Sequence, residues 1–181
     1  MNKYEEKTLH TDKIFEGKVI SLQIDEVELP DGNRSKREIV KHPGAVAVIA
    51  VTSDNKIIMV EQYRKPLERS LIEIPAGKLE KGEDPLSSAK RELEEETGLQ
   101  SGEWSYITSF YTSPGFADEL IHIYLAKNVF PVENSRPGDE DEFIDIYYAA
   151  LDEAKEWKRQ EKIRDAKTEY ALIYAEAKGL I

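Results

Sequence analysis

Residues 77–99 read GKLEKGEDPLSSAKRELEEETGL, and they contain the clearest helix signal in the chain. Asp84 can cap a helix, Pro85 suits its first position, and Gly98 can end it. Three apolar residues recur at helical spacing: Leu86, Ala89 and Leu93. The stretch therefore predicts an amphipathic helix that begins at Pro85 and stops before Gly98.

The same helix concentrates carboxylates on one side. Glu92 and Glu96 are four residues apart and share a face, and Glu95 lies within the same third of the circumference. Like charges at this spacing destabilise a helix by a few tenths of a kcal/mol per pair, whereas a divalent cation reverses that sign. Oxygen ligands of this kind suit Mg²⁺ or Mn²⁺ better than zinc. Taken alone, such a run is more often a solvated acidic face.

The spacing of the wider stretch decides against that plain interpretation. From Gly77 to Leu99 the sequence fits the pattern GX5EX7REUXEEXGU, where U is a bulky aliphatic residue, at every defined position. With ordinary residue frequencies, chance agreement is below about one in a million. The chain thus resembles the Nudix hydrolases, a family that cleaves a nucleoside diphosphate linked to another moiety.

The resemblance implies an α/β fold, namely an α/β/α sandwich with a mixed β-sheet, and a Mg²⁺ cofactor for which Mn²⁺ may substitute. It implies metal ligands at four positions, the first through its backbone carbonyl: Ala76, Glu92, Glu95 and Glu96. Glu92 and Glu96 are the main ligands and so take part in catalysis, and Glu95 supports them. Arg91 is expected to orient the glutamates through charge-assisted hydrogen bonds, and Glu83 is expected to support the site.

The flanks narrow the subfamily. Pro114 lies fifteen residues past Leu99, a distance typical of ADP-ribose pyrophosphatases. Five further segments resemble that subfamily: KREIVKHPGAVAV, EQYRKPLE, IEIPAGKLE, FYTSPGFADE and IRDAKTEYAL. The resemblance runs from about Phe15 to Tyr174. It implies hydrolysis of ADP-ribose to AMP and ribose 5-phosphate.

Several site residues follow from the resemblance. Glu142 is expected to be the catalytic base or an extra metal ligand, with Glu140 as its rival in the same acidic loop. Arg64 is expected to grip the diphosphate, and Glu73 to face the same cleft. The other expected substrate-binding residues are Arg37 and Glu38 for adenine, Glu119 for the terminal ribose, and Gly115 for close backbone approach.

One departure from the subfamily concerns adenine. Some relatives stack the base on an aromatic residue just after the glycine that corresponds to Gly17. Here Lys18 and Val19 follow instead. Either another ring, such as that of Phe15, takes this role, or hydrogen bonds hold the adenine.

The chain order predicts two parts that meet at the breaker His42-Pro43-Gly44. Residues 1–43 read as a small antiparallel β segment that, by resemblance, serves in dimerisation and on the adenine side of the site. Residues 44–181 read as the Nudix domain. Strands are expected near 45–51, 57–63, 71–74, 103–111, 120–127 and 143–149, and helices near 151–160 and 167–178. We expect a homodimer, because the N-terminal strands are too small for an independent core.

Composition excludes several classes. Among 181 residues, 36 are acidic and 25 basic, so the net charge is −11. This balance argues against a nucleic-acid partner and against a basic membrane contact. The chain has no cysteine, which removes disulfides and thiolate chemistry. No apolar stretch is long enough for a membrane span, and the N-terminus lacks a signal sequence, so we expect a cytoplasmic protein.

Two alternatives remain at this point. The enzyme may be a broader diphosphatase for ADP-glucose, GDP-mannose or NADH. A noncatalytic sensor that binds ADP-ribose is the other possibility. It is disfavoured because every glutamate of the motif is present and no basic recognition helix follows.

Overall fold

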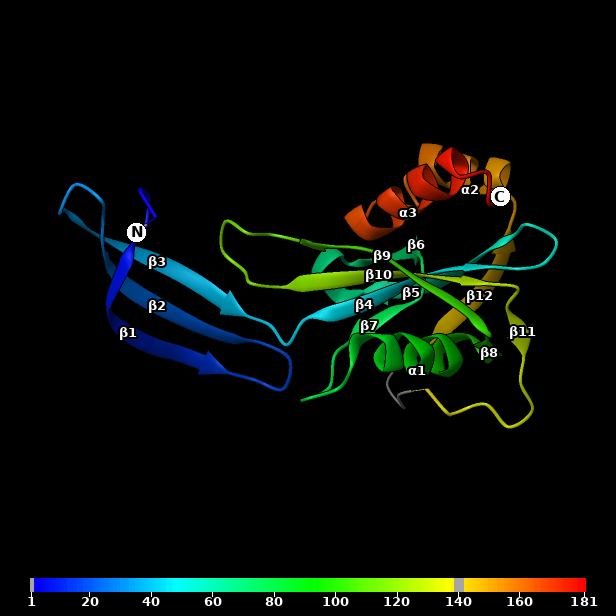
Figure 1. The fold of residues 1–181 in the computed structure, drawn as a ribbon, viewed down its shortest axis with the longest axis horizontal. Coiled ribbons are helices and arrows are strands. Elements are labelled where there is room, and N and C mark those ends of the chain that lie inside the picture. Colours follow the sequence, from blue (N-terminus) through cyan, green and yellow to red (C-terminus); the bar gives the residue numbers. More distant parts are fainter. Residues whose placement is uncertain (1, 139–141) are drawn as a thin grey trace. The chain divides into compact units, whose positions relative to one another are not determined.

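The computed structural model describes residues 2–138 and 142–181. These form two compact units (Figure 1). One unit comprises residues 1–44 and 110–121, and the other comprises 45–109 and 122–181. The first division falls at the predicted breaker. The segment 110–121 groups with the first unit, where Ala117 forms a single β-bridge with Val40.

The first unit is built on a three-stranded antiparallel sheet. Its strands are β1 (Lys7–Glu16), β2 (Ser21–Glu28) and β3 (Arg34–Lys41), in the order β1-β2-β3. Gly32 takes a φ of +83° in the turn between β2 and β3, a conformation that favours glycine. All of β1 is exposed on both faces, so this sheet buries little apolar surface within one chain.

The second unit contains the larger sheet, in the order β12-β5-β4-β10-β9, with β6 added to β5 and β7 to β4. The strands are β4 (Ala45–Val51), β5 (Ile57–Arg64), β6 (Arg69–Glu73), β7 (Ala76–Lys78), β9 (Glu103–Tyr111), β10 (Leu120–Lys127) and β12 (Ile144–Ala149). A separate pair joins β8 (Leu99–Gln100) to β11 (Phe130–Pro131), and a 3₁₀ turn covers Lys65–Leu67.

Three helices complete an α/β/α arrangement in this unit. Helix α1 (Pro85–Thr97) lies on one side of the sheet, and α2 (Leu151–Arg159) and α3 (Ala166–Ala177) lie on the other (Figure 1). Strand β4 is buried at every residue, as expected for a central strand covered on both faces. Leu93 of α1 packs in one core cluster with Val48 and Ile58, so the apolar stripe of the helix faces the sheet.

Local chemistry fixes the ends of the two best-defined helices. The carboxylate of Asp84 accepts a hydrogen bond from the amide of Ser87 at 3.0 Å, and Gly98 ends α1 with a φ of +67°. Asp165 caps α3 in the same way through the amide of Thr168, also at 3.0 Å. A side chain at position 98 would be strained in this left-handed conformation.

The expected elements are present, with differences at their edges. β1 begins at Lys7, inside the predicted β segment of residues 1–43. β7 is a strand that the sequence did not predict, because Ala76 and Gly77 carry no strand signal and form a strand only by pairing with β4. Within the described residues no helix has the length and apolarity that a membrane crossing requires.

Candidate active site

Helix α1 gathers a dense ion-pair cluster around Arg91. Its guanidinium donates to both carboxylate oxygens of Glu83, at 3.0 and 2.9 Å, and to Glu92 and Glu95 at 2.8 Å each. The hydrogen bonds that Glu83 accepts, chiefly those from Arg91, lower the pKa of Glu83 to about 2. Arg91 therefore links the outer glutamate to two of the three glutamates predicted as ligands.

Gly77 lies in close contact with Glu92. A Cβ at position 77 would lie 2.0 Å from the carboxyl carbon of Glu92, so the end of that side chain would have to move. The first glycine of the motif thus leaves space for the carboxylate of Glu92, an expected ligand fifteen residues later. Burial raises the pKa of Glu92, although Arg91 opposes that shift.

Glu96 stands in a different environment on the same helix. It is 9% exposed, and its carboxylate accepts a hydrogen bond from the amide of Ala76 at 3.0 Å. Among the described residues no cation forms an ion pair with it. Burial raises the pKa of Glu96 to about 8, and the charges of Glu92 and Glu142 add to the shift. A buried carboxyl without a cation is a group that a bound metal ion would stabilise.

Glu142 lies with these glutamates. A small cavity of about 220 Å³ is lined by Glu95, Glu96, Gly138, Glu142 and Ile144. The charge of Glu142 also raises the pKa of both Glu92 and Glu96, which places it within electrostatic range of the two. The structure therefore brings Glu142 and the motif's glutamates to one place. The rival base, Glu140, lies outside the described residues.

The donor set fits a hard divalent cation, although it is not closed around one. In residues 2–138 and 142–181, no three acidic or histidine side chains converge as a ready ion-binding set. Arg91 holds the carboxylates of Glu92 and Glu95, and Glu96 faces the Ala76 amide. Carboxylate oxygens with a buried, unpaired member match the preference of Mg²⁺ for oxygen ligands. The metal roles of Ala76, Glu92, Glu95 and Glu96 remain predictions.

Arg64, expected to grip a diphosphate, is paired with Glu73. Its Nε and Nη2 donate to the two carboxylate oxygens of Glu73 at 2.8 and 2.7 Å. Glu73 is 2% exposed, while the side chain of Arg64 is 35% exposed. The carboxylate of Glu73 also raises the pKa of Arg64, and the charge of Glu96 does so less strongly. Arg64 is thus close enough to Glu96 for its pKa to be affected, and Glu73 holds its guanidinium in place.

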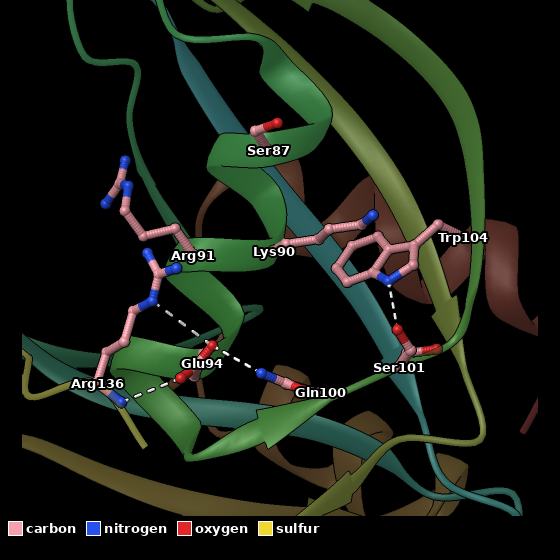
Figure 2. Close-up of a pocket in the computed structure, with 8 residues that line it drawn as sticks. All are labelled: Ser87, Lys90, Arg91, Glu94, Gln100, Ser101, Trp104 and Arg136. Atoms are coloured by element: carbon pink, nitrogen blue, oxygen red, sulfur yellow. Dashed lines mark hydrogen bonds and ion pairs between the residues drawn. The ribbon is translucent and has the colours of Figure 1, made fainter. Parts of the chain in front are cut away.

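Another face of α1 lines a separate cavity of about 420 Å³ (Figure 2). There the carboxylate of Glu94 accepts hydrogen bonds from Gln100 at 2.9 Å and from the amide of Arg136 at 3.1 Å. Trp104 donates from its indole to the carbonyl of Ser101 at 2.8 Å. Glu94 occupies a position that the motif leaves undefined, and these contacts tie α1 to strand β8 and to the segment that contains Arg136.

The remaining predicted residues lie in the first unit. Arg37 forms a forked ion pair with Glu6 and is half-buried, whereas Glu38 is exposed. Because neighbouring residues of a strand project from opposite faces, Arg37 and Glu38 do not share one face of β3. Both side chains could therefore contact one adenine only if the base lay at the edge of this sheet. The prediction that both bind the base is limited to that arrangement.

The predicted ribose loop is docked on the end of β3. The amide of Val40 donates to the carbonyl of Phe116 at 2.8 Å, and the amide of His42 donates to Asp118 at 2.8 Å. Glu119 accepts from Thr112 and lies 3.6 Å from the ring of His42. Pro114 lies in the turn that precedes these contacts. Gly115 has no atom near its built Cβ, so the protein itself requires no glycine there.

Sequence analysis missed several polar residues that the structure draws to the sites. Lys167 and Asp165 meet at the back of Glu73, and Thr168 binds the backbone next to it. Their segment, IRDAKTEYAL, contributed to the resemblance without any site role being assigned. Asp118, which joins Lys41 and His42, is another such residue. Asp165 is recognisable from sequence as a helix cap, whereas the other groups show only polar side chains among apolar positions.

Comparisons with known proteins agree with this geometry. The model of the NUDIX domain matches residues 41–170. A methanol dehydrogenase activator from Bacillus methanolicus is 60% identical over 171 residues, which cover 94% of this chain and 92% of that protein. An ADP-ribose pyrophosphatase from Bacillus subtilis (strain 168) is 56% identical over 178 residues, covering 98% and 96%.

More distant relatives extend the same pattern. An ADP-ribose pyrophosphatase from Mycobacterium tuberculosis is 39% identical and covers 81% of this chain, and 70% of that protein is matched. A solved ADP compounds hydrolase superposes with a TM-score of 0.84 over 98% of this chain and 97% of that one, at 19% identity, which shows the fold alone. The domain match and the full-length relatives together show that the chain belongs to the NUDIX domain family.

Proposed function

We propose that this protein is a metal-dependent ADP-ribose diphosphatase. The observation that carries the proposal is the buried Glu96 carboxyl, unpaired by any cation in the described residues and grouped with Glu92, Glu95 and Glu142. Relatives at 56% and 39% identity that are named ADP-ribose pyrophosphatases support this substrate. The acidic chain repels a diphosphate, so a cation between the two is needed for binding.

The reaction breaks one P–O bond of the diphosphate. The oxygen of water bonds to one phosphorus, the bridging oxygen leaves on the other, and a proton is released. The products are AMP and ribose 5-phosphate. Positioning and charge neutralisation supply most of the catalysis in such transfers, and the residues of α1 are arranged for both.

Each site residue then has a distinct task. Glu92 and Glu96, helped by Glu95 and the Ala76 carbonyl, would hold Mg²⁺. When bound, the ion neutralises phosphate charge and makes a water molecule more acidic. Glu142 accepts the proton of the attacking water. Arg64 offers donors to the diphosphate.

The first unit is proposed to select the adenosine and ribose parts of the substrate, through Arg37 or Glu38 and through Glu119. Its β1 strand also supports a homodimer, since five of the apolar side chains near it are exposed: Leu9, Ile14, Phe15, Val19 and Ile20. Sedimentation at micromolar concentration tests this. A fully active monomer would refute the dimer. A cytoplasmic location completes the proposal.

A substrate panel tests the function. The protein is incubated with Mg²⁺ and, separately, ADP-ribose, ADP-glucose, GDP-mannose, NADH and a diadenosine polyphosphate, and the products are separated by liquid chromatography. We expect AMP and ribose 5-phosphate from ADP-ribose, with preference over the others. The Glu96→Gln variant is the control for contaminating hydrolases. Binding of ADP-ribose without products would instead favour the sensor.

A second candidate is a broader nucleotide-sugar diphosphatase. Relatives named GDP-mannose pyrophosphatase, from Cronobacter sakazakii and Salmonella, are 33% and 32% identical, well below the ADP-ribose relatives. Turnover of GDP-mannose or ADP-glucose at least equal to that of ADP-ribose would select this candidate and leave the proposed chemistry in place.

A further inference from the structure

The start of helix α3 carries a polar motif, Asp165-Ala166-Lys167-Thr168, that none of the proposed roles uses. The motif lies about 70 residues beyond α1 in the sequence, yet Lys167 and Thr168 contact the end of strand β6, and Asp165 contacts both of them. Residues drawn together over such a separation are held by tertiary structure. Their contacts therefore show what α3 does for the neighbouring site.

Thr168 is the anchor of this contact. It is fully buried, and its hydroxyl accepts a hydrogen bond from the amide of Ile74 at 3.0 Å. Ile74 directly follows β6, and two residues later the amide of Ala76 donates to Glu96. The first turn of α3 thus fixes the short backbone segment that joins Glu73 to the expected metal site.

Lys167 continues the contact through charge. Its side chain is 14% exposed, and its ammonium donates to the Glu73 carboxylate and, at 2.9 Å, to Asp165. Asp165 in turn caps the helix through the Thr168 amide. One oxygen of Asp165 is buried without a partner among the described residues, so this carboxylate is held by the helix end and by Lys167 alone.

Positive and negative groups therefore alternate along this series of contacts. The positive N-terminal end of α3 meets Asp165, followed by Lys167, Glu73 and Arg64. Arg64 is the last group in the series, and the charge of Glu96 raises its pKa. If Lys167 were absent, Arg64 would be the one cation among the described residues paired with the Glu73 carboxylate. The positive charge of Arg64 would then be largely neutralised by this buried partner.

We propose that Lys167 is a positioning residue of the hydrolytic site, which acts on the substrate diphosphate through Glu73 and Arg64. By sharing the Glu73 carboxylate, Lys167 fixes the Arg64 fork and leaves more of its positive charge for a diphosphate. Asp165 and Thr168 hold Lys167 and the backbone after β6 in place. This inference rests on the proposed function, because it assumes a diphosphate substrate.

The test is a double-mutant cycle on the full-length protein. The variants are Lys167→Met, Arg64→Ala and the two combined, with Lys167→Arg as the conservative replacement. Each is assayed for kcat and KM with ADP-ribose and Mg²⁺. Lys158→Met is the matched control, because Lys158 also pairs with a glutamate of α3 but is 48% exposed. Circular dichroism and thermal unfolding verify the fold of each variant.

We expect Lys167→Met to raise KM about tenfold or more, with a smaller change in kcat, and Lys167→Arg to restore most of the loss. In the Arg64→Ala background, Lys167→Met should add little, since residues that act through one another are not additive. Lys158→Met should behave like the unsubstituted protein. A purely structural lysine would lower the amount of folded protein and leave KM unchanged.

The outcomes separate this inference from the proposed function. If the unsubstituted protein does not hydrolyse ADP-ribose, the proposed function fails, and the cycle is measured on whichever diphosphate of the panel is turned over. If ADP-ribose is hydrolysed but the effects of Lys167→Met and Arg64→Ala simply add, the positioning role is refuted. If Lys167→Met does not fold, Lys167→Gln takes its place in the cycle: a raised KM that is not additive with Arg64→Ala supports the role, and an unchanged KM overturns it.

Discussion

Glu73 and Glu96 are two buried glutamates of the same unit, and their surroundings shift their pKa values in opposite directions. Glu73 is 2% exposed and shares its charge between Arg64 and Lys167, which outweigh burial and lower its pKa. Glu96 is 9% exposed and has only a backbone amide as partner, so burial raises its pKa to about 8. Burial alone therefore does not raise a carboxyl pKa; burial without a neighbouring cation does, and that is why Glu96 is the predicted functional acid.

The largest expected effect comes from Glu96. Replacing Glu96 by Gln removes a charged ligand, so we expect kcat/KM to fall on the order of a thousandfold, equivalent to several kcal/mol of lost stabilisation. The metal-free fold should keep its stability, because a neutral amide suits this buried place. Kinetics with Mg²⁺ and thermal unfolding with a chelator measure the two effects. Near-normal turnover would remove Glu96 from the site.

We expect the matching substitution at Glu73 to lower the stability of the fold more than Glu96→Gln does. Glu73→Gln leaves two cations without their carboxylate, and breaking such a buried pair costs about 3 kcal/mol. Urea unfolding of the metal-free protein gives the free energy of unfolding. A loss as small as that of Glu96→Gln would abolish the contrast between the two glutamates.

The pH dependence of metal binding sharpens the comparison. Because Glu96 must lose its proton to bind an ion, Mg²⁺ affinity should rise with pH by up to about tenfold per unit until pH 8. Calorimetry in buffers of different ionisation enthalpy should detect one released proton per ion near pH 7. Affinity that is independent of pH over this range would contradict the raised pKa.

The metal-free protein should show the opposite trend. The folded pKa of Glu96 lies above its ordinary value of 4.5, so its contribution to stability is complete below that value and is lost as pH rises toward 8. Glu96→Gln should abolish this part of the pH dependence. The comparison is made by urea unfolding at several pH values with a chelator present.

The smallest effect concerns Glu83, which is paired with Arg91. Its pKa is lowered from 4.5 to about 2, so its stabilisation is present above 4.5 and disappears as pH falls toward 2. Glu83→Gln should therefore cost about 1 kcal/mol at neutral pH and nothing at the acid end. Acid unfolding curves of the two proteins test this, and parallel curves at all pH values would argue against it.

Much of the fold was predictable from local patterns. The caps of α1, its apolar stripe and the apolar run of β4 each follow from residues close in sequence, and the structure has these elements at the expected bounds. β7 was missed because Ala76-Gly77-Lys78 pairs only with a strand that is distant in sequence. The contact of Ala117 with Val40 at the end of β3 could not be predicted for a similar reason, since the two residues are far apart in sequence.

The site divides in the same way. The sequence alone determined which side chains share the ligand face of α1, because helical spacing places Glu92, Glu95 and Glu96 together. Only the tertiary structure decided that Glu96 has no cation in the described chain and that Glu73 has two. Lys167 reaches Glu73 across 94 residues of sequence. A carboxylate's pKa depends on its desolvation and on charges within a few ångströms, and both are set by the packing of distant segments.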